Sequence, residues 1–235
     1  ATDLAANTLY QVTVTDDNGC TAVTTILLTQ PTAAVTAAAT VNTNYNGQDV
    51  SCNGETDGQI SVLGSGGTQF TVNDPYTYNW STSASNDTLT VGAGVYTVTV
   101  TDTLGCTAVT TVTVNEPSLL TAAITGQTDI SCFGDSTGQA TVNANGGTVV
   151  GNYAYVWDNG IVTALNGNLP AGVQCVTVTD ANGCLATTCV TITQPATPIG
   201  IANATVNSNV SCKGGNDGEL SVTPEGGSPA ATGYN

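Results

Sequence analysis

The chain has 235 residues, of which 17 are acidic and one, Lys213, is basic; it contains no His, and its formal net charge is −16. This charge excludes nucleic acid as a partner, because phosphate binding needs a basic surface. The lack of His and Arg removes the usual general bases and oxyanion donors, so we expect no enzyme activity.

The cysteines and the absence of long apolar runs indicate the compartment. The sequence contains neither a signal peptide nor an apolar run of about 18 residues, so no membrane span is predicted in this segment. Eight Cys residues without C-x2-C pairs favour disulfides in an oxidising compartment over zinc sites. We therefore predict an extracellular protein without a cofactor. The absence of Met indicates an interior piece of a longer chain.

Residues 1–30 are predicted to be the C-terminal strands of a partial repeat. A short strand is expected near Leu4, and a hairpin follows over residues 10–31, YQVTVTDDNGCTAVTTILLTQP. Val and Thr alternate before a turn of Asp, Asn and Gly, and the alternation resumes after it. A period of two on both sides of such a turn is typical of a β-hairpin.

Residues 31–116 are predicted to be a complete repeat that ends in the same hairpin, over residues 93–117. Turn signals and alternation predict the elements before it in this order: strands over 33–41 and 49–52, a polar loop over 53–58, a strand over 59–63, a break over 64–67, an alternating strand with Tyr76, Tyr78 and Trp80, and a short strand over 88–91. The Trp side chain is expected in the core.

Alternation along the hairpin also assigns its two faces. The residues expected inside are Tyr96, Val98, Val100, Ala108 and Val112. The residues expected outside are Thr97, Thr99, Thr101, Thr107, Thr111 and Thr113.

Residues 117–194 repeat this plan, with Tyr153, Tyr155 and Trp157 in the aromatic strand, and residues 195–235 begin it again as the N-terminal strands of another partial repeat. The cysteines of a recurring SC-x-G motif are 80 residues apart: Cys52, Cys132 and Cys212. About seven short strands and one Trp per unit predict an all-β fold, with tandem Ig-like or PKD-like β-sandwich repeats of about 80 residues forming an elongated rod.

The ordered motifs resemble the SprB-type repeat of surface adhesins from gliding Bacteroidetes. They are SC-x-G-x-x-x-G, a Gly-Gly break, Y-x-Y-x-W, the hairpin AGVYTVTVTD-x-x-GC and a closing Q-P or E-P, and they extend over nearly the whole chain. The resemblance implies type IX secretion, display as long filaments, and a role in adhesion or gliding motility. The chain departs from the pattern at Gln174, which replaces the hairpin Tyr, and at Cys175 and Cys189.

The hairpin register predicts one disulfide. It places Cys175 opposite Cys189, where the preceding repeat has Thr97 opposite Thr111.

The pairing of the other cysteines stays open. One arrangement links repeats, with Cys52 bonded to Cys184 and Cys132 bonded to a turn beyond residue 235. The other pairs cysteines within repeats, Cys52 with Cys106 and Cys132 with Cys184. Free thiols are the third alternative.

Two kinds of site are candidates at the turns. Glu55 and Asp57 of one repeat, with Asp180 and Asn182 of the next, could supply oxygen ligands to Ca²⁺, although Asp and Asn are also good turn formers. By the same family resemblance, Thr88 and Thr103 lie in Asp-Thr-apolar motifs similar to those that Bacteroidetes O-glycosylate in exported proteins.

The function expected from these features is that of a structural shaft of an extracellular adhesin, whose partners are neighbouring repeats or copies of the same filament. The alternative is a module that binds a carbohydrate or a surface, with surface polysaccharide as its partner. Such a module should expose an aromatic platform, whereas here the aromatic residues alternate toward the core. The outer Thr-x-Thr rows also fit an ice-binding face, although Cys175 and Cys189 interrupt them.

Overall fold

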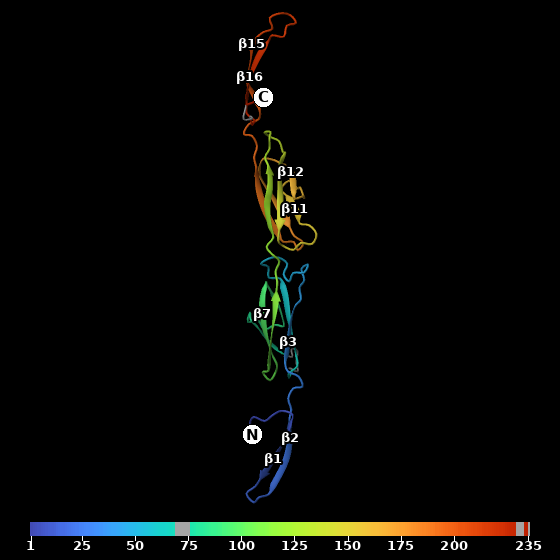
Figure 1. The fold of residues 1–235 in the computed structure, drawn as a ribbon. Coiled ribbons are helices and arrows are strands. Elements are labelled where there is room, and N and C mark those ends of the chain that lie inside the picture. The colour runs from blue at the N-terminus through green and yellow to red at the C-terminus, as the bar shows by residue number, and fades with distance from the viewer. Residues whose placement is uncertain (69–75, 229–232, 235) are drawn as a thin grey trace. The chain divides into compact units, whose positions relative to one another are not determined.

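A computed structural model describes residues 1–68, 76–228 and 233–234 of the chain, and these residues form sixteen strands and no helix (Figure 1). None of the described residues therefore forms a helix that could cross a membrane. The contacts divide the chain into two compact units. Unit 1 comprises residues 1–44 and 55–115, and unit 2 comprises residues 45–54 and 116–235.

Unit 1 contains one isolated hairpin and one β-sandwich. The hairpin is β1 (Thr8–Thr15) with β2 (Thr21–Leu28). The sandwich has two antiparallel sheets of three strands each, in the orders β3-β4-β6 and β5-β7-β8. These strands are β3 (Thr36–Val41), β4 (Gly58–Ser65), β5 (Thr77–Trp80), β6 (Thr88–Val91), β7 (Gly94–Thr101) and β8 (Thr107–Val114).

Unit 2 has the same plan in the opposite order, with a sandwich followed by a two-stranded sheet. The sandwich sheets have the orders β12-β10-β9 and β11-β13-β14, and β15 pairs with β16. The strands are β9 (Thr121–Thr128), β10 (Gly138–Asn145), β11 (Ala154–Trp157), β12 (Leu165–Leu169), β13 (Gly172–Thr179), β14 (Leu185–Ile192), β15 (Gly200–Ser208) and β16 (Glu219–Glu225).

The two-residue period of the hairpins sets what each face buries. In β7, Val98 and Val100 are fully buried, while Thr99 between them lies on the other face. Branched side chains fit a pleated surface that is buried on one side, and this favours strands from a sequence of alternating Val and Thr. The predicted inner and outer faces of this hairpin are confirmed.

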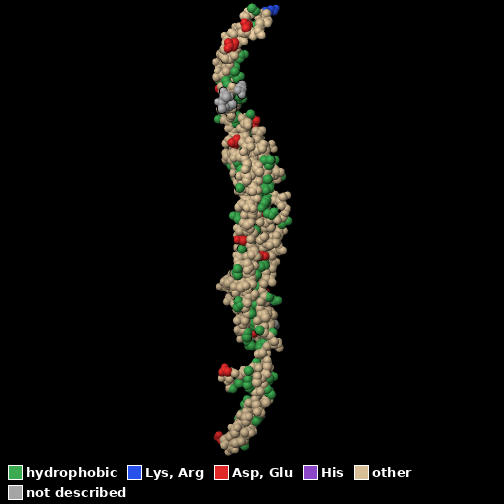
Figure 2. Space-filling view, in the orientation of Figure 1, with side chains coloured by type: hydrophobic (Ala, Val, Ile, Leu, Met, Phe, Trp, Pro, Cys, Tyr) green, Lys and Arg blue, Asp and Glu red, His purple; other side chains and the backbone are tan. Residues whose placement is uncertain are grey.

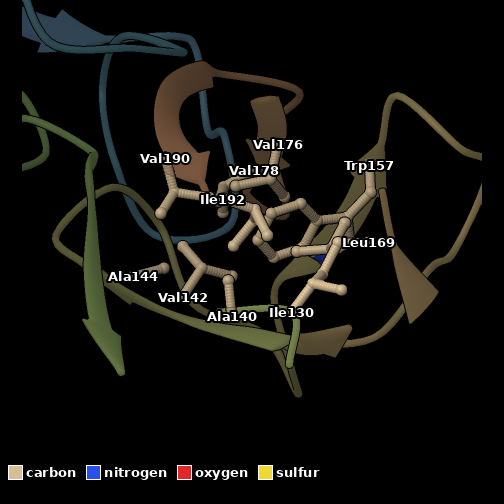
Figure 3. Packing of buried hydrophobic residues seen from close by; sticks show 10 residues of the cluster. All are labelled: Ile130, Ala140, Val142, Ala144, Trp157, Leu169, Val176, Val178, Val190 and Ile192. Atoms are coloured by element: carbon tan, nitrogen blue, oxygen red, sulfur yellow. The ribbon is translucent and has the colours of Figure 1, made fainter. Parts of the chain in front are cut away.

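The core of unit 2 lies between its two sheets (Figure 3). Side chains from β10 point toward those from β13 and β14, and Trp157 closes the cluster from β11. The indole nitrogen of Trp157 donates a hydrogen bond of 2.9 Å to the carbonyl oxygen of Thr163, so its one polar group is paired inside the protein. Trp80 makes the equivalent bond to Asn86 in unit 1, and both Trp residues are buried, as predicted.

Three expectations about strands were wrong. Each sandwich has six strands among its described residues instead of seven. Residues 49–52 form bends instead of a strand. The segment near Leu4 forms no strand, because the corresponding strand β6 is held by pairing with β4 and no described strand pairs with that segment.

The predicted break over residues 64–67 lies later than expected. β4 runs through Gly64 to Ser65, and a Cβ atom on Gly64 would lie 2.7 Å from the ring of Tyr76. Gly64 therefore makes room for an aromatic side chain, while the chain turns at Gly66 and Gly67, which both have positive φ.

Candidate functional site: a disulfide-linked loop and turn

A disulfide joins Cys52 to Cys184, with 5.7 Å between their Cα atoms and a sequence separation of 132. Cys52 lies in the loop Tyr45–Gly54, which follows β3 in the sequence but is grouped with unit 2 by its contacts. Cys184 ends the turn between β13 and β14. Of the two pairings that the sequence left open, the structure therefore has the one that links repeats.

Asp180 shapes the turn that presents Cys184. One carboxylate oxygen of Asp180 accepts hydrogen bonds of 2.9 Å from the backbone N–H groups of Asn182 and Cys184. The other accepts a bond of 2.7 Å from the N–H of Thr148. One carboxylate therefore holds both the turn and the backbone at Thr148, which follows β10.

Asp102 has the same role in unit 1. Its pKa lies below its usual range, chiefly because the N–H of Thr68 donates to its carboxylate, although burial acts in the opposite direction. The N–H groups of Cys106 and Leu104 lower the pKa further.

Asn182 connects the turn to the loop. Its side-chain nitrogen lies 2.9 Å from the carbonyl oxygen of Ser51, 3.1 Å from that of Tyr45 and 3.0 Å from the hydroxyl of Thr148. Its side-chain oxygen accepts a bond of 2.7 Å from the amide of Asn46. Asn182 was predicted as a metal ligand or as a turn former, and its role as a hydrogen-bonding centre was missed.

The closing E-P and Q-P motifs hold the SC-x-G loops. The N–H of Gly54 donates a 2.6 Å bond to the carboxylate of Glu116. In the next repeat, the N–H of Gly134 donates a 2.9 Å bond to the side-chain oxygen of Gln194. The two motifs recur together in the sequence, which was the available signal for this contact.

The Gly-Gly corners are required by the backbone. Gly146 has φ +83°, and a Cβ atom on it would lie 2.0 Å from the carbonyl oxygen of Leu119. A Cβ atom on Gly147 would lie 2.4 Å from the carboxylate of Asp180. The hydroxyl of Tyr153 donates a 2.9 Å bond to the carbonyl oxygen of Gly146, so the aromatic strand holds the corner in place.

A second disulfide joins Cys175 to Cys189 across β13 and β14, with 4.0 Å between their Cα atoms. It is the pair that the hairpin register predicts, and Thr97 and Thr111 face each other at the same place in unit 1. The N–H of Cys175 also donates a 2.9 Å bond to the carboxylate of Asp158.

Comparison with known families matches these motifs. The SprB repeat matches residues 44–85, 124–161 and 204–232. Three segments of the chain, which together make up less than half of it, are thus similar to SprB-type repeats. The matched segments run from before each SC-x-G motif to the aromatic strand or the Gly-Gly corner. The hairpins lie outside them, so the family match covers less of the chain than the motifs suggested.

Similarity to individual proteins adds little. No curated protein matches the chain. A crystal structure of the C-terminal 282-residue fragment of intimin, in complex with the intimin-binding domain of its translocated receptor, is 16% identical, covers 72% of this chain and 67% of its own, and has a TM-score of 0.35. The three N-terminal domains of the bacteriophage RB49 outer capsid protein Hoc are 18% identical, cover 86% and 72%, and have a TM-score of 0.38. With such low scores, no argument rests on either likeness.

The alternative pairing of cysteines within repeats does not form. Cys106 and Cys132, both expected in disulfides, are exposed free thiols, as are Cys20 and Cys212. In unit 2 the reason is distance. The Cys132 loop is held by Gln194 after β14, while Cys184 precedes β14, and the eight residues of that strand span about 27 Å at about 3.4 Å each. A disulfide needs Cα atoms within about 7 Å.

The calcium candidates do not meet as a cluster. The described residues contain no group of three or more His, Cys, Asp or Glu side chains that could hold a metal ion. Asp180 accepts backbone N–H groups and Asn182 bonds the loop, so both side chains have structural partners. Glu55 and Asp57 belong to unit 1, and neither is part of a metal-binding group among the described residues.

The two O-glycosylation candidates differ in their surroundings. The hydroxyl of Thr103 donates a 2.9 Å bond to the carbonyl oxygen of Thr68, so a glycan there would have to break that bond. Thr88 begins β6 opposite Ser61 and is half-buried. Modification of either residue remains a prediction.

Proposed function

We propose that this chain is part of the structural shaft of an extracellular filamentous adhesin and that it carries mechanical load. The observation that supports this most is the Cys52–Cys184 bond, since it ties together residues that are 132 positions apart. A chain pulled from both ends transmits force from residue 52 to residue 184 through sulfur. The residues between them are then relieved of that force.

The charge and the disulfides agree with a place outside the cell. Disulfides persist in oxidising compartments, and a net charge of −16 keeps an exposed fibre soluble. Attachment to a cell surface, type IX secretion and a part in gliding motility are included in the proposal because three segments of the chain match the SprB repeat. The expected absence of enzyme activity is part of the same proposal.

The alternative role, as a carbohydrate- or surface-binding module, finds less support. Such modules stack sugars on exposed aromatic rings. Trp80 and Trp157 are buried here, as are Tyr76 and Tyr78. Phe133 and Tyr234 are exposed, but the Trp and Tyr residues of the two aromatic strands serve the cores of the sandwiches.

Immunogold electron microscopy of the producing cells tests the proposal. Antibodies raised against this chain should label extracellular filaments along their length, and the purified chain should bind no polysaccharide in a saturable manner. Label confined to the cell interior would contradict the proposal. Saturable sugar binding by the chain would favour the binding module instead.

A further inference from the structure

Asn-Gly pairs recur along this chain, and one of them has a carboxylate bonded to its glycine. The N–H of Gly54 donates a 2.6 Å bond to the carboxylate of Glu116, and Asn53, the residue before Gly54, is exposed. Acidic side chains, in red, lie at scattered points of the visible face, most of which is neutral (Figure 2), and strands β1 to β15 contain no charged residue. A carboxylate at this amide is therefore a particular feature of the loop.

An Asn side chain that is followed by glycine can close into a five-membered ring. The ring forms when the glycine nitrogen attacks the Cγ atom of Asn, and glycine hinders this attack least because it has no Cβ atom. A Cβ atom placed on Gly54 would meet nothing within 4 Å, so the space around this residue is open. The attacking nitrogen must lose its proton, and a carboxylate in hydrogen-bond contact can accept that proton.

We propose that Asn53 is a site of spontaneous deamidation and that Glu116 acts as the general base. The amide nitrogen of Asn53 donates a 3.0 Å bond to the carbonyl oxygen of Pro117, and all these residues belong to unit 2. The nitrogen that leaves and the nitrogen that attacks are thus both bonded to the Glu116–Pro117 dipeptide. The proposal does not depend on the load-bearing role, so the two can fail separately.

The covalent steps need only water as a second reactant. Glu116 takes the proton of the Gly54 nitrogen, and this nitrogen forms a bond to Cγ of Asn53. The Cγ–Nδ2 bond breaks, and Nδ2 takes the proton from Glu116 and leaves as ammonia. Water then adds to one of the two carbonyl carbons of the succinimide, which restores the Gly54 N–H and leaves aspartate or isoaspartate at position 53.

The glycines of two other Asn-Gly pairs in unit 2 donate to carbonyl oxygens instead. The N–H groups of Gly160 and Gly183 donate to backbone carbonyl oxygens at 2.8 Å and 3.2 Å. A carbonyl oxygen is a far weaker base than a carboxylate, so it does not help to remove the proton. Asn159 and Asn182 should therefore keep their side-chain amides for longer than Asn53.

The SC-x-G loop of the next repeat has neither reactant. Phe133 stands in the place of Asn53, and Gln194, in the place of Glu116, accepts the N–H of Gly134 at 2.9 Å. That loop is held without a carboxylate and without Asn. The variant Glu116→Gln therefore reproduces a hydrogen bond that this protein already makes, and it removes only the base.

Deamidation changes what holds the loop. The new carboxylate cannot donate a hydrogen bond to Pro117, and it adds a negative charge near that of Glu116. The Cys52–Cys184 bond takes no part in the reaction, so the loop stays attached through sulfur. We expect the hydrogen bond between Gly54 and Glu116 to weaken with time while the disulfide persists.

The test follows the full oxidised chain in neutral buffer made with heavy-oxygen water. Each carboxyl group that forms takes up one heavy oxygen, which peptide mass spectrometry assigns to a residue. We expect faster uptake at Asn53 than at Asn159 and Asn182. In Glu116→Gln, uptake at Asn53 should fall about 100-fold, the lower end of what a positioned general base contributes, and should stay unchanged at the other two residues.

Two results of this experiment would overturn the proposal. One is uptake at Asn53 that is no faster than at Asn159 or Asn182. The other is equal uptake at Asn53 in the wild type and in Glu116→Gln.

The pH dependence separates a general base from exposure alone. A carboxylate base is ionised throughout the range from pH 6 to pH 8, so the wild-type rate at Asn53 should stay nearly constant there. In Glu116→Gln the base is hydroxide, so the rate should rise in proportion to the hydroxide concentration. A wild-type rate that rises in the same way would overturn the role of Glu116.

The variant Asn53→Asp imitates one product and tests the effect on the loop. Hydrogen exchange at the Gly54 amide should be faster in this variant than in the wild type. The control Asn53→Phe, which loses the bond to Pro117 but gains no charge, should exchange more slowly than Asn53→Asp. Exchange in Asn53→Asp that is no faster than in the wild type would overturn the expected loosening.

Discussion

At the scale of single residues, an Asp carboxylate connects each hairpin turn to the Gly-Gly corner beside it. Asp102 and Asp180 accept backbone N–H groups from their own turn and from the residue that follows the corner. The space for this contact exists because Gly67 and Gly147 have no side chain: a Cβ atom on either would lie within 2.5 Å of the carboxylate. Turn and corner therefore depend on one another.

The requirement for glycine can be separated into its backbone and contact parts. Gly146 and Gly160 have the same φ, +83°, but a Cβ atom meets Leu119 only at Gly146 and has open space at Gly160. Gly160→Ala should cost about 1 kcal/mol of unfolding free energy for its left-handed backbone. Gly146→Ala should cost about 3 kcal/mol, because overpacking adds about 1–3 kcal/mol. Guanidinium unfolding of both variants checks this, and equal losses would contradict the clash.

The Asp residues also predict how stability depends on pH. Hydrogen bonds lower the pKa of Asp102, as they do for Asp129, which is bonded by Thr193 and Gln127. A carboxyl whose pKa is lower in the folded chain stabilises the fold above its unfolded pKa, about 3.9. That stabilisation is lost as the pH falls through this value and through the lower folded one. Melting temperatures from pH 7 to pH 2 should fall in this window, and Asp102→Asn should flatten the profile; an unchanged slope in the variant would contradict the assignment.

At the scale of elements, the Cys175–Cys189 bond is a local replacement of a Thr pair. The double variant Cys175→Thr and Cys189→Thr should lose about 2–3 kcal/mol of unfolding free energy, since the bond contributes about 3 kcal/mol and a Thr pair restores at most about 1 kcal/mol. Denaturant unfolding without reductant measures the loss.

The preceding hairpin provides the matched control. Thr97→Cys with Thr111→Cys should form the same bond, because these residues face each other at the same register. This variant should gain about 2–3 kcal/mol of unfolding free energy, since the bond contributes about 3 kcal/mol and the lost Thr pair contributed at most about 1 kcal/mol. Failure to oxidise would show that opposition in the register is insufficient.

The hairpins and the aromatic strands could be predicted because their signals are local. Alternation of Val with Thr is visible within eight residues, and it sufficed to place Cys175 opposite Cys189. The contacts that hold the SC-x-G loop at Ser51–Gly54 are not local. Asn182 and Ser51 are 131 residues apart, and Gly54 and Glu116 are 62 apart, so no local pattern indicated either bond, and only the joint recurrence of two motifs pointed to the second. The bends at residues 49–52 were missed for the same reason, because this loop is shaped by residues that are distant in the sequence.

At the scale of the whole molecule, the Cys52–Cys184 bond gives the chain a covalent path that is shorter than its backbone. Force applied to the two termini passes from residue 52 to residue 184, and the 132-residue span between them is bypassed. At about 3.4 Å per residue, that span amounts to about 450 Å of extended chain. If this bond bears load, reducing it should therefore release the bypassed chain and lengthen the molecule.

Single-molecule force extension of the full chain, pulled from its two termini, tests this claim most directly. The oxidised chain should extend only through residues 1–52 and 184–235, and addition of reductant should release about 450 Å more. The variant Cys175→Thr with Cys189→Thr, which keeps the Cys52–Cys184 bond, should remain short until it is reduced. Full extension of the oxidised chain, or equal lengths with and without reductant, would contradict the account.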